Sequence, residues 1–200
     1  MWPWEHAIVG YIAYSAFCHL VYRDSPTGLE TIVVVFASVL PDIIDKPLAW
    51  EFGVFESGYA LGHSIFFAVP LAMFVGLLTY AAGRPRLGWG FGIGYLLHLP
   101  ADVIPIYFMR GEWQWERILW PVERTRGTPE DRGFVEQFFF LFDGYWAEIT
   151  SGDPSAYVWF QIGMTVFVVF LWIYDGAPVL REVVSGIKRA VLKRFGTVSS

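Results

Sequence analysis

The sequence predicts an all-α integral membrane protein, and three observations lead to this fold class. The 200-residue chain is 55% hydrophobic and only 16% charged, whereas soluble domains are about 25% charged. Five apolar segments reach or approach the roughly 20 residues that a helix needs to cross a bilayer. Ten Trp and ten Tyr fit the aromatic belts found at membrane interfaces. Because open sheets leave backbone groups unpaired in hydrocarbon, we expect a helical bundle.

We expect about five spanning helices in one multi-pass bundle in the cell membrane. The segments are Ala7–Tyr22, Leu29–Ile44, Ser64–Ala82, Leu87–Phe108 and Ala156–Tyr174. The first two are shorter and more polar than the others, so they need neighbouring helices to be stable. The fourth begins with alternating glycines, a small-residue pattern that permits close helix packing.

Two further helices are expected outside the spans, after connecting loops at Lys46–Tyr59 and Arg110–Ser155. Within the second loop, Phe134–Phe142 is too short to span and reads as an interfacial helix. The tail has an apolar stripe opposite a basic face, which suits a helix on an anionic membrane surface. The alternative for the tail is a solvated surface helix. The expected organisation is therefore a membrane domain over residues 1–177 and an amphipathic tail over 178–200. The apolar stripe consists of Val179, Leu180, Val183, Val184, Ile187, Val191 and Leu192.

Histidines and carboxylates occur near one end of four of the expected spans. If successive spans alternate in direction, the start of span one, the end of span two, the start of span three and the far part of span four share one side of the membrane. The opposite half looks apolar apart from His19. The residues concerned are His6, Asp42, Asp45, His63, His98 and Asp102.

Such groups are costly to bury in hydrocarbon unless they are paired or bind a metal. His98 and Asp102 are four residues apart, so on a helix they share one face. Each pair alone is more typical of a buried hydrogen bond, but their convergence favours a metal site. The expected ligands are His6, Asp42, His63, His98 and Asp102.

The donor set indicates which ion the site would hold. Nitrogen and oxygen donors suit zinc first, with manganese and iron(II) as alternatives. Cys18 is the single cysteine, which excludes a Cys-rich zinc site.

A metal with an open coordination position activates water, so hydrolysis of an ester or phosphodiester is the natural chemistry. Asp45 and Glu56 are the candidate catalytic groups, although Glu56 also reads as a solvated side chain. The expected partners are membrane lipids and a small-molecule or lipid substrate. The net charge of −5, without a basic face in the membrane domain, gives no support for nucleic-acid binding. The alternative is a non-enzymatic membrane protein that uses the polar cluster for ion or proton passage or for helix packing.

The motifs at these positions resemble a family of membrane-bound metal-dependent hydrolases that includes a LexA-regulated bacterial inner-membrane protein. The resemblance covers about residues 1–105, and the opening Trp-Pro-Trp-Glu-His looks like an archaeal branch. Through a distant similarity to zinc-dependent phospholipases C, it implies an all-α site of His and Asp. The family often has His-Arg-Gly where Gly58-Tyr59-Ala60 stands here. The matching motifs are His6, Leu40-Pro41-Asp42, Gly62-His63-Ser64 and Gly94-Tyr95-Leu96-Leu97-His98 with Asp102.

Overall fold

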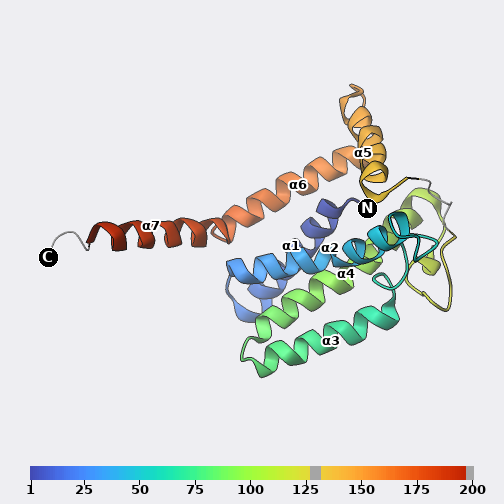
Figure 1. Ribbon diagram of the computed structural model, residues 1–200. Helices are drawn as coiled ribbons and strands as arrows, with labels where there is room; N and C mark the ends of the chain where they lie inside the picture. The colour runs from blue at the N-terminus through green and yellow to red at the C-terminus, as the bar shows by residue number, and fades with distance from the viewer. Residues whose placement is uncertain (127–131, 197–200) are drawn as a thin grey trace.

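The protein is all-α, as predicted. A computed structural model describes residues 1–126 and 132–196, and this part contains seven α-helices and no strand (Figure 1). A π-helix over Cys18–Tyr22 continues α1, and a short 3-10 helix covers Trp115–Arg117. The α-helices are α1 (Pro3–Phe17), α2 (Gly28–Trp50), α3 (Ile65–Ala81), α4 (Pro85–Arg110), α5 (Phe134–Thr150), α6 (Ala156–Tyr174) and α7 (Leu180–Gly196).

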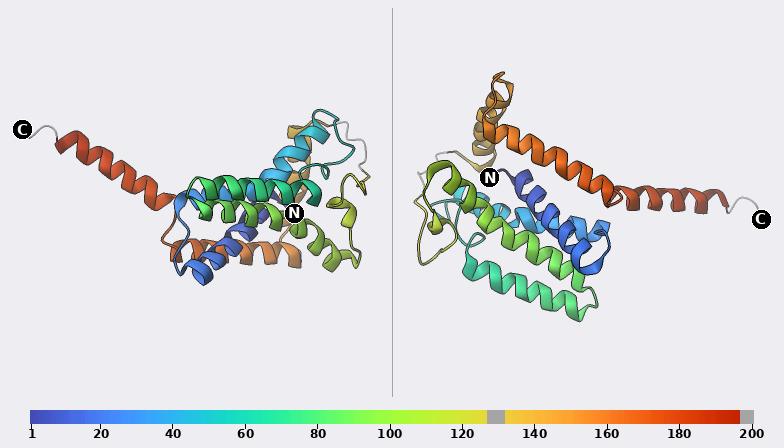
Figure 2. Two further views of the ribbon diagram at one scale, coloured as in Figure 1. Left: turned by 90° about the horizontal axis from the view of Figure 1, so that it is seen from below. Right: turned by 180° about the vertical axis from the view of Figure 1, so that it is seen from behind.

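Helices α1 to α4 form a bundle in which α4 packs against the other three (Figures 1 and 2). Close approach depends on small residues. A Cβ at Gly94 of α4 would lie 2.5 Å from the carbonyl oxygen of Val34, and one at Gly10 of α1 would lie 2.0 Å from Ser38 Oγ. Larger side chains at these positions would separate the helices. The buried core beside these contacts includes Ala37 and Tyr95, both with 0% exposure.

The outer surface of the bundle is apolar, as expected for contact with lipid. On α3, Phe74 is 58% exposed and Leu77 is 67% exposed, and on α6 Phe170 is 68% exposed. Contiguous exposed apolar surface of this kind marks a membrane or protein contact. By length and composition, two helices of the described chain can cross a membrane, Pro85–Phe108 and Ala156–Tyr174, while Ile65–Ala81 is apolar but shorter.

Two predicted boundaries were wrong. The expected loop at Lys46 starts only at Glu51, because α2 continues through Pro41 and Pro47 to Trp50. A proline removes one backbone donor, but a packed helix can continue through it. Helix α5 begins at Phe134 as predicted but continues past Phe142 to Thr150.

Helix α7 follows α6 and extends away from the bundle (Figures 1 and 2). Its Glu182 accepts a hydrogen bond from the Gly28 N–H at the start of α2, with 2.6 Å between the nitrogen and Oε1. The apolar residues Val183 and Ile187 are 52% and 59% exposed, so the apolar stripe is not covered by the rest of the protein. That α7 lies on a membrane surface stays a prediction. Residues 197–200 of the tail, and the Val191 and Leu192 side chains of its stripe, lie outside the described residues.

Candidate metal centre

The predicted ligands come together at one end of the bundle. Helix α2 supplies Asp42, the segment before α3 supplies His63, and α4 supplies His98 and Asp102. All four side chains are buried, with at most 4% exposure. Each offers one donor atom, and these atoms all lie within 4.8 Å of one another. The expected alternation of helix direction therefore predicted correctly that these four side chains lie together.

Four of the distances between the donor atoms match those between ligands of one ion, whereas His98 Nε2 lies farther, at 3.8 Å, from Asp42 Oδ1. His63 Nε2 lies 3.0 Å from His98 Nε2 and 3.3 Å from Asp42 Oδ1. Asp102 Oδ2 lies 3.4 Å from Nε2 of His63 and 3.4 Å from Nε2 of His98. Ligands placed about 2.0–2.2 Å from a zinc ion are roughly 3–3.6 Å from one another. The residues present fit such an ion.

The hydrogen bonds on the far side of each imidazole decide which nitrogen faces the centre. His63 Nδ1 lies 2.8 Å from Asp45 Oδ2, and His98 Nδ1 lies 2.6 Å from the carbonyl oxygen of Ser38. Both partners can only accept, so each Nδ1 carries the proton in the neutral ring. Two Nε2 lone pairs then face each other across 3.0 Å. Either a proton on one of the two Nε2 atoms or a metal cation between them removes this repulsion.

His6 adjoins the group of four from the other side of Asp102. Its Nε2 lies 3.3 Å from Asp102 Oδ1, and its ring stacks on His98 with 3.7 Å between centroids. The His6 side chain is buried, and neither ring nitrogen has a hydrogen-bond partner within the described chain. Buried polar atoms are rarely left unsatisfied. The predicted ligand His6 is thus at the centre, but outside the closest group.

Two ammonium groups also lie at the carboxylates. Lys46 Nζ is 2.7 Å from Asp42 Oδ1, and the amino nitrogen of Met1 is 2.9 Å from Asp102 Oδ1. The centre therefore attracts positive charge at both acids. Sequence reasoning did not single out Lys46, although its spacing of four residues from Asp42 on one helix is a recognisable ion-pair signal.

Comparison with protein families places the chain in a membrane family. The family model described as YdjM inner membrane protein matches residues 1–179. The chain belongs to the YdjM inner membrane protein family. Comparison with curated proteins and with solved structures gives no match. The match extends well past the 1–105 region that carried the resemblance in sequence, and it includes every residue of the candidate centre.

The two candidate catalytic residues of this YdjM-family chain have very different surroundings. Asp45 is fully buried and accepts hydrogen bonds from the N–H groups of Ala60, Gly62 and His63 at 2.8, 2.8 and 3.0 Å, besides the one from His63 Nδ1. Four donors leave Asp45 little capacity to take a proton, and they make it an orienting group for His63. Glu56 is exposed and lines a separate cavity of about 240 Å³.

Tyr59 is a site residue that the sequence did not reveal. Its ring meets His63 edge-on at 4.9 Å between centroids, and its hydroxyl accepts a hydrogen bond of 2.8 Å from Arg117. Burial, followed by the charges of Asp102 and Asp42, raises the pKa of Tyr59 well above its usual range. The hydroxyl therefore keeps its proton at neutral pH.

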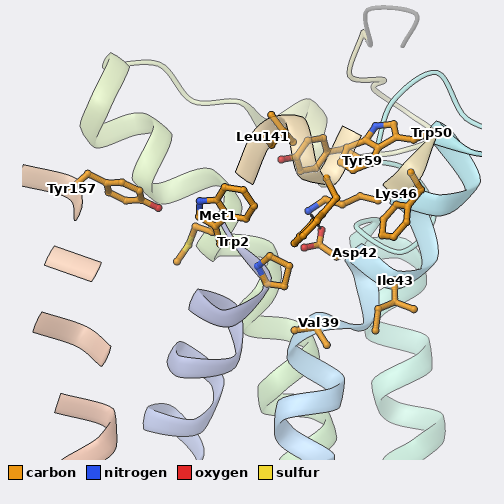
Figure 3. Close-up of a pocket in the computed structure, with 13 residues that line it drawn as sticks. Met1, Trp2, Val39, Asp42, Ile43, Lys46, Trp50, Tyr59, Leu141 and Tyr157 are labelled. Atoms are coloured by element: carbon orange, nitrogen blue, oxygen red, sulfur yellow. Dashed lines mark ion pairs between the residues drawn. The ribbon is translucent and has the colours of Figure 1, made fainter. Parts of the chain in front are cut away.

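A cavity of about 510 Å³ opens beside the centre (Figure 3). Asp42, Lys46 and Tyr59 line it together with apolar residues of α2 and α5. Its volume lies within the roughly 300–1,000 Å³ of small-molecule sites. The centre thus has an adjoining space for a ligand.

The expectation that the opposite half is apolar apart from His19 was wrong. There, buried Asp175 accepts hydrogen bonds from Tyr11 and Ser15 at 2.6 and 2.8 Å, and lies 2.7 Å from His19 Nε2. Asp175 is the C-terminal cap residue of α6. The sequence did not single it out because it directly follows the expected apolar span, which ended at Tyr174. His19 itself has a side chain that is 31% exposed and that pairs with Asp175, away from the group of four.

Proposed function

We propose that this protein is a membrane-bound, metal-dependent hydrolase acting on an ester or phosphodiester. Asp42, His63, His98 and Asp102 would hold the ion, with His6 as a further donor beside Asp102. Zinc suits this nitrogen and oxygen set first, with manganese and iron(II) as alternatives. The supporting observation is the pair of Nε2 atoms that face each other across 3.0 Å while both rings donate their Nδ1 protons outward.

The surrounding residues have separate positioning tasks in this proposal. Asp45 holds the His63 ring, and the Ser38 carbonyl holds the His98 ring, so both Nε2 atoms point to the centre. A bound divalent ion would supply water of lowered pKa and polarise the substrate oxygen. Tyr59 lines the adjoining cavity with its proton retained, so its hydroxyl can donate a hydrogen bond to a substrate oxygen. Glu56 lines a separate cavity, and this proposal assigns it no catalytic role.

We also propose that the protein is multi-pass, with α1 and its π-helical extension, α2, α3, α4 and α6 all crossing the membrane. The exposed apolar faces of α3 and α6 support this arrangement, as does the family match. The candidate centre would then lie near one membrane surface, where α2 and α4 carry their carboxylates.

The hydrolase proposal is tested with purified protein in detergent. We expect about one divalent ion per chain by mass spectrometry, and turnover of a water-soluble diester such as bis(p-nitrophenyl) phosphate or of a nitrophenyl ester. A chelator should abolish turnover, zinc or manganese should restore it, and the far-ultraviolet helical signal should persist throughout. Glu56→Gln serves as the matched carboxylate control and should retain turnover. Purified protein without metal that also fails to bind added zinc would contradict the proposal.

A further inference from the structure

The cavity beside the candidate centre has a polar end and a long apolar part. Its polar end includes Asp42, Lys46 and Tyr59, and Met1, whose amino nitrogen lies 2.9 Å from Asp102 Oδ1, also lines the cavity. Its apolar lining includes Val39 and Ile43 on α2 and Leu141 on α5 (Figure 3). Phe138 on α5 and the N-terminal residues Trp2 and Pro3 also line it. A ligand that fills this space must therefore combine a polar group with a hydrocarbon portion.

The charges at the polar end favour an anionic group. In the proposed loaded state, a divalent ion balances the two carboxylates Asp42 and Asp102. Lys46 Nζ lies 2.7 Å from Asp42 Oδ1 in this structure. Once the ion balances Asp42, the positive charge of Lys46 is no longer neutralised by that carboxylate. Its side chain is 16% exposed, so little water solvates this charge. An ammonium group in such a position is a good partner for a phosphate.

The apolar wall is continuous with the outer apolar surface of the protein. On α5, Val135 and Phe139 are 62% and 56% exposed and do not line the cavity, whereas Phe138 and Leu141 of the same helix do. A helix that is apolar on both sides fits between a hydrocarbon ligand and surrounding lipid. Ile43 and Leu141, which line the cavity, are themselves 51% and 42% exposed, so a hydrocarbon chain can pass between the cavity and the outer apolar surface.

We propose that this cavity binds a phosphate-bearing lipid, with the phosphate beside Lys46 and the candidate centre, and an acyl chain between α2 and α5. The proposal rests on the proposed hydrolase function and names the substrate class of that same site. The phosphodiester or phosphomonoester of a membrane lipid would thus be presented to the centre from the membrane, without leaving it.

The test uses the full chain in nanodiscs of phosphatidylcholine that contain phosphatidic acid with a diazirine in its acyl chain. After photolysis, mass spectrometry maps the labelled residues. We expect labelling at Phe138, Leu141 or Ile43 that unlabelled phosphatidic acid competes away. Diacylglycerol, a fatty acid and free phosphate should each compete at least about tenfold less well, since each lacks one part of the ligand. Equal competition by diacylglycerol or fatty acid would overturn the phosphate assignment.

Matched variants test the two ends of the cavity. Leu141→Trp fills the apolar part and should abolish the competed label, whereas Phe139→Trp, on the exposed side of the same helix, should keep it. Lys46→Gln should weaken competition by phosphatidic acid about tenfold, and Lys46→Arg should restore it. Labelling confined to the outer faces of α3 and α6, unchanged by Leu141→Trp, would overturn the proposal.

Metal content and turnover of the water-soluble diester are measured on the same preparations. If metal and turnover are present but the cavity is not labelled, the lipid proposal fails and the hydrolase proposal stands. If the cavity is labelled but the protein binds no metal, the hydrolase proposal fails, and with it the assignment of this lipid as a substrate.

Discussion

The bundle buries a histidine–carboxylate cluster at each end, and the two clusters differ in their balance of donors and acceptors. At one end, Asp175 faces the hydroxyl groups of Tyr11 and Ser15 and the ring of His19. At the other end, the unprotonated nitrogens of His63 and His98 face each other and the carboxylates. The first cluster supplies its own protons. The second has an excess of acceptors when both rings are neutral, and either a proton on His63 or a bound metal cation balances it.

The balance of hydrogen-bond donors and acceptors distinguishes a packing cluster from a candidate metal centre better than the types of residue do. Both clusters contain His and Asp, and both are buried. Helix α2 places Val34 and Ala37, each with 0% exposure, between its start and Asp42. The buried Ser38 hydroxyl beside them donates its hydrogen bond to the Val34 carbonyl oxygen of the same helix. That arrangement favours two local roles over a continuous path for ions or protons.

The largest effect should come from removing two facing ligands. His63→Ala combined with His98→Ala should lower zinc affinity by more than about 100-fold, because losing even an outer partner of a ligand costs about 10–100-fold. His19→Ala, at the other cluster, should leave metal content unchanged. Metal analysis after dialysis against a weak chelator measures both. If the double variant and the unaltered protein retain the same amount of zinc per chain, His63 and His98 are not the ligands.

A smaller effect should come from the two buried carboxylates that touch histidines without belonging to the group of four. Asp45→Asn should weaken zinc binding about 10–100-fold, because it loosens the His63 ring. Asp175→Ala should leave zinc binding unchanged but destabilise the fold by about 1–3 kcal/mol, because it strands the Tyr11 and Ser15 hydroxyls. Zinc titration and thermal unfolding in detergent give the two readouts. If Asp175→Ala lowers zinc affinity as much as Asp45→Asn does, the two clusters do not have separate roles.

The smallest effect concerns pH. Burial alone would lower the pKa of His63, but hydrogen bonds to Asp102, Asp42 and Asp45 raise it from 6.5 to about 10. In metal-free protein, protonated His63 therefore stabilises the fold fully below pH 6.5, and this contribution is lost as the pH rises toward 10. Metal binding needs the unprotonated ring, so it strengthens over the same range. The difference in Tm between zinc-loaded and chelated protein should widen with rising pH.

The His19→Ala variant provides the control for this trend, because it leaves the metal end untouched and should show the same widening. A Tm difference that stays constant or narrows across this range would contradict the assignment of His63 as a ligand.

Part of this structure follows from local patterns. The apolar run at Ala156–Tyr174 predicted the bounds of α6 correctly, because the position of this helix depends mainly on its own residues. The pairs at His98 and Asp102, with alternating helix direction, predicted which residues meet. Helix ends near proline were less predictable. The expected span already included Pro41 and ended at Ile44, whereas α2 also continues through Pro47 to Trp50, because a packed helix tolerates the backbone donor that a proline removes.

The sequence by itself determined that the chain is helical and suited to a membrane, and that His6, Asp42, His63, His98 and Asp102 gather at one end. The periodicity and length of the apolar segments predict the helices, and the position of each polar residue within its helix predicts the end at which it lies. Only the tertiary structure decided that Asp45 orients His63, that Tyr59 and Lys46 border a cavity, and that Asp175 anchors the opposite end. These roles depend on contacts between segments distant in sequence, and on which hydrogen-bond partners each group has already found.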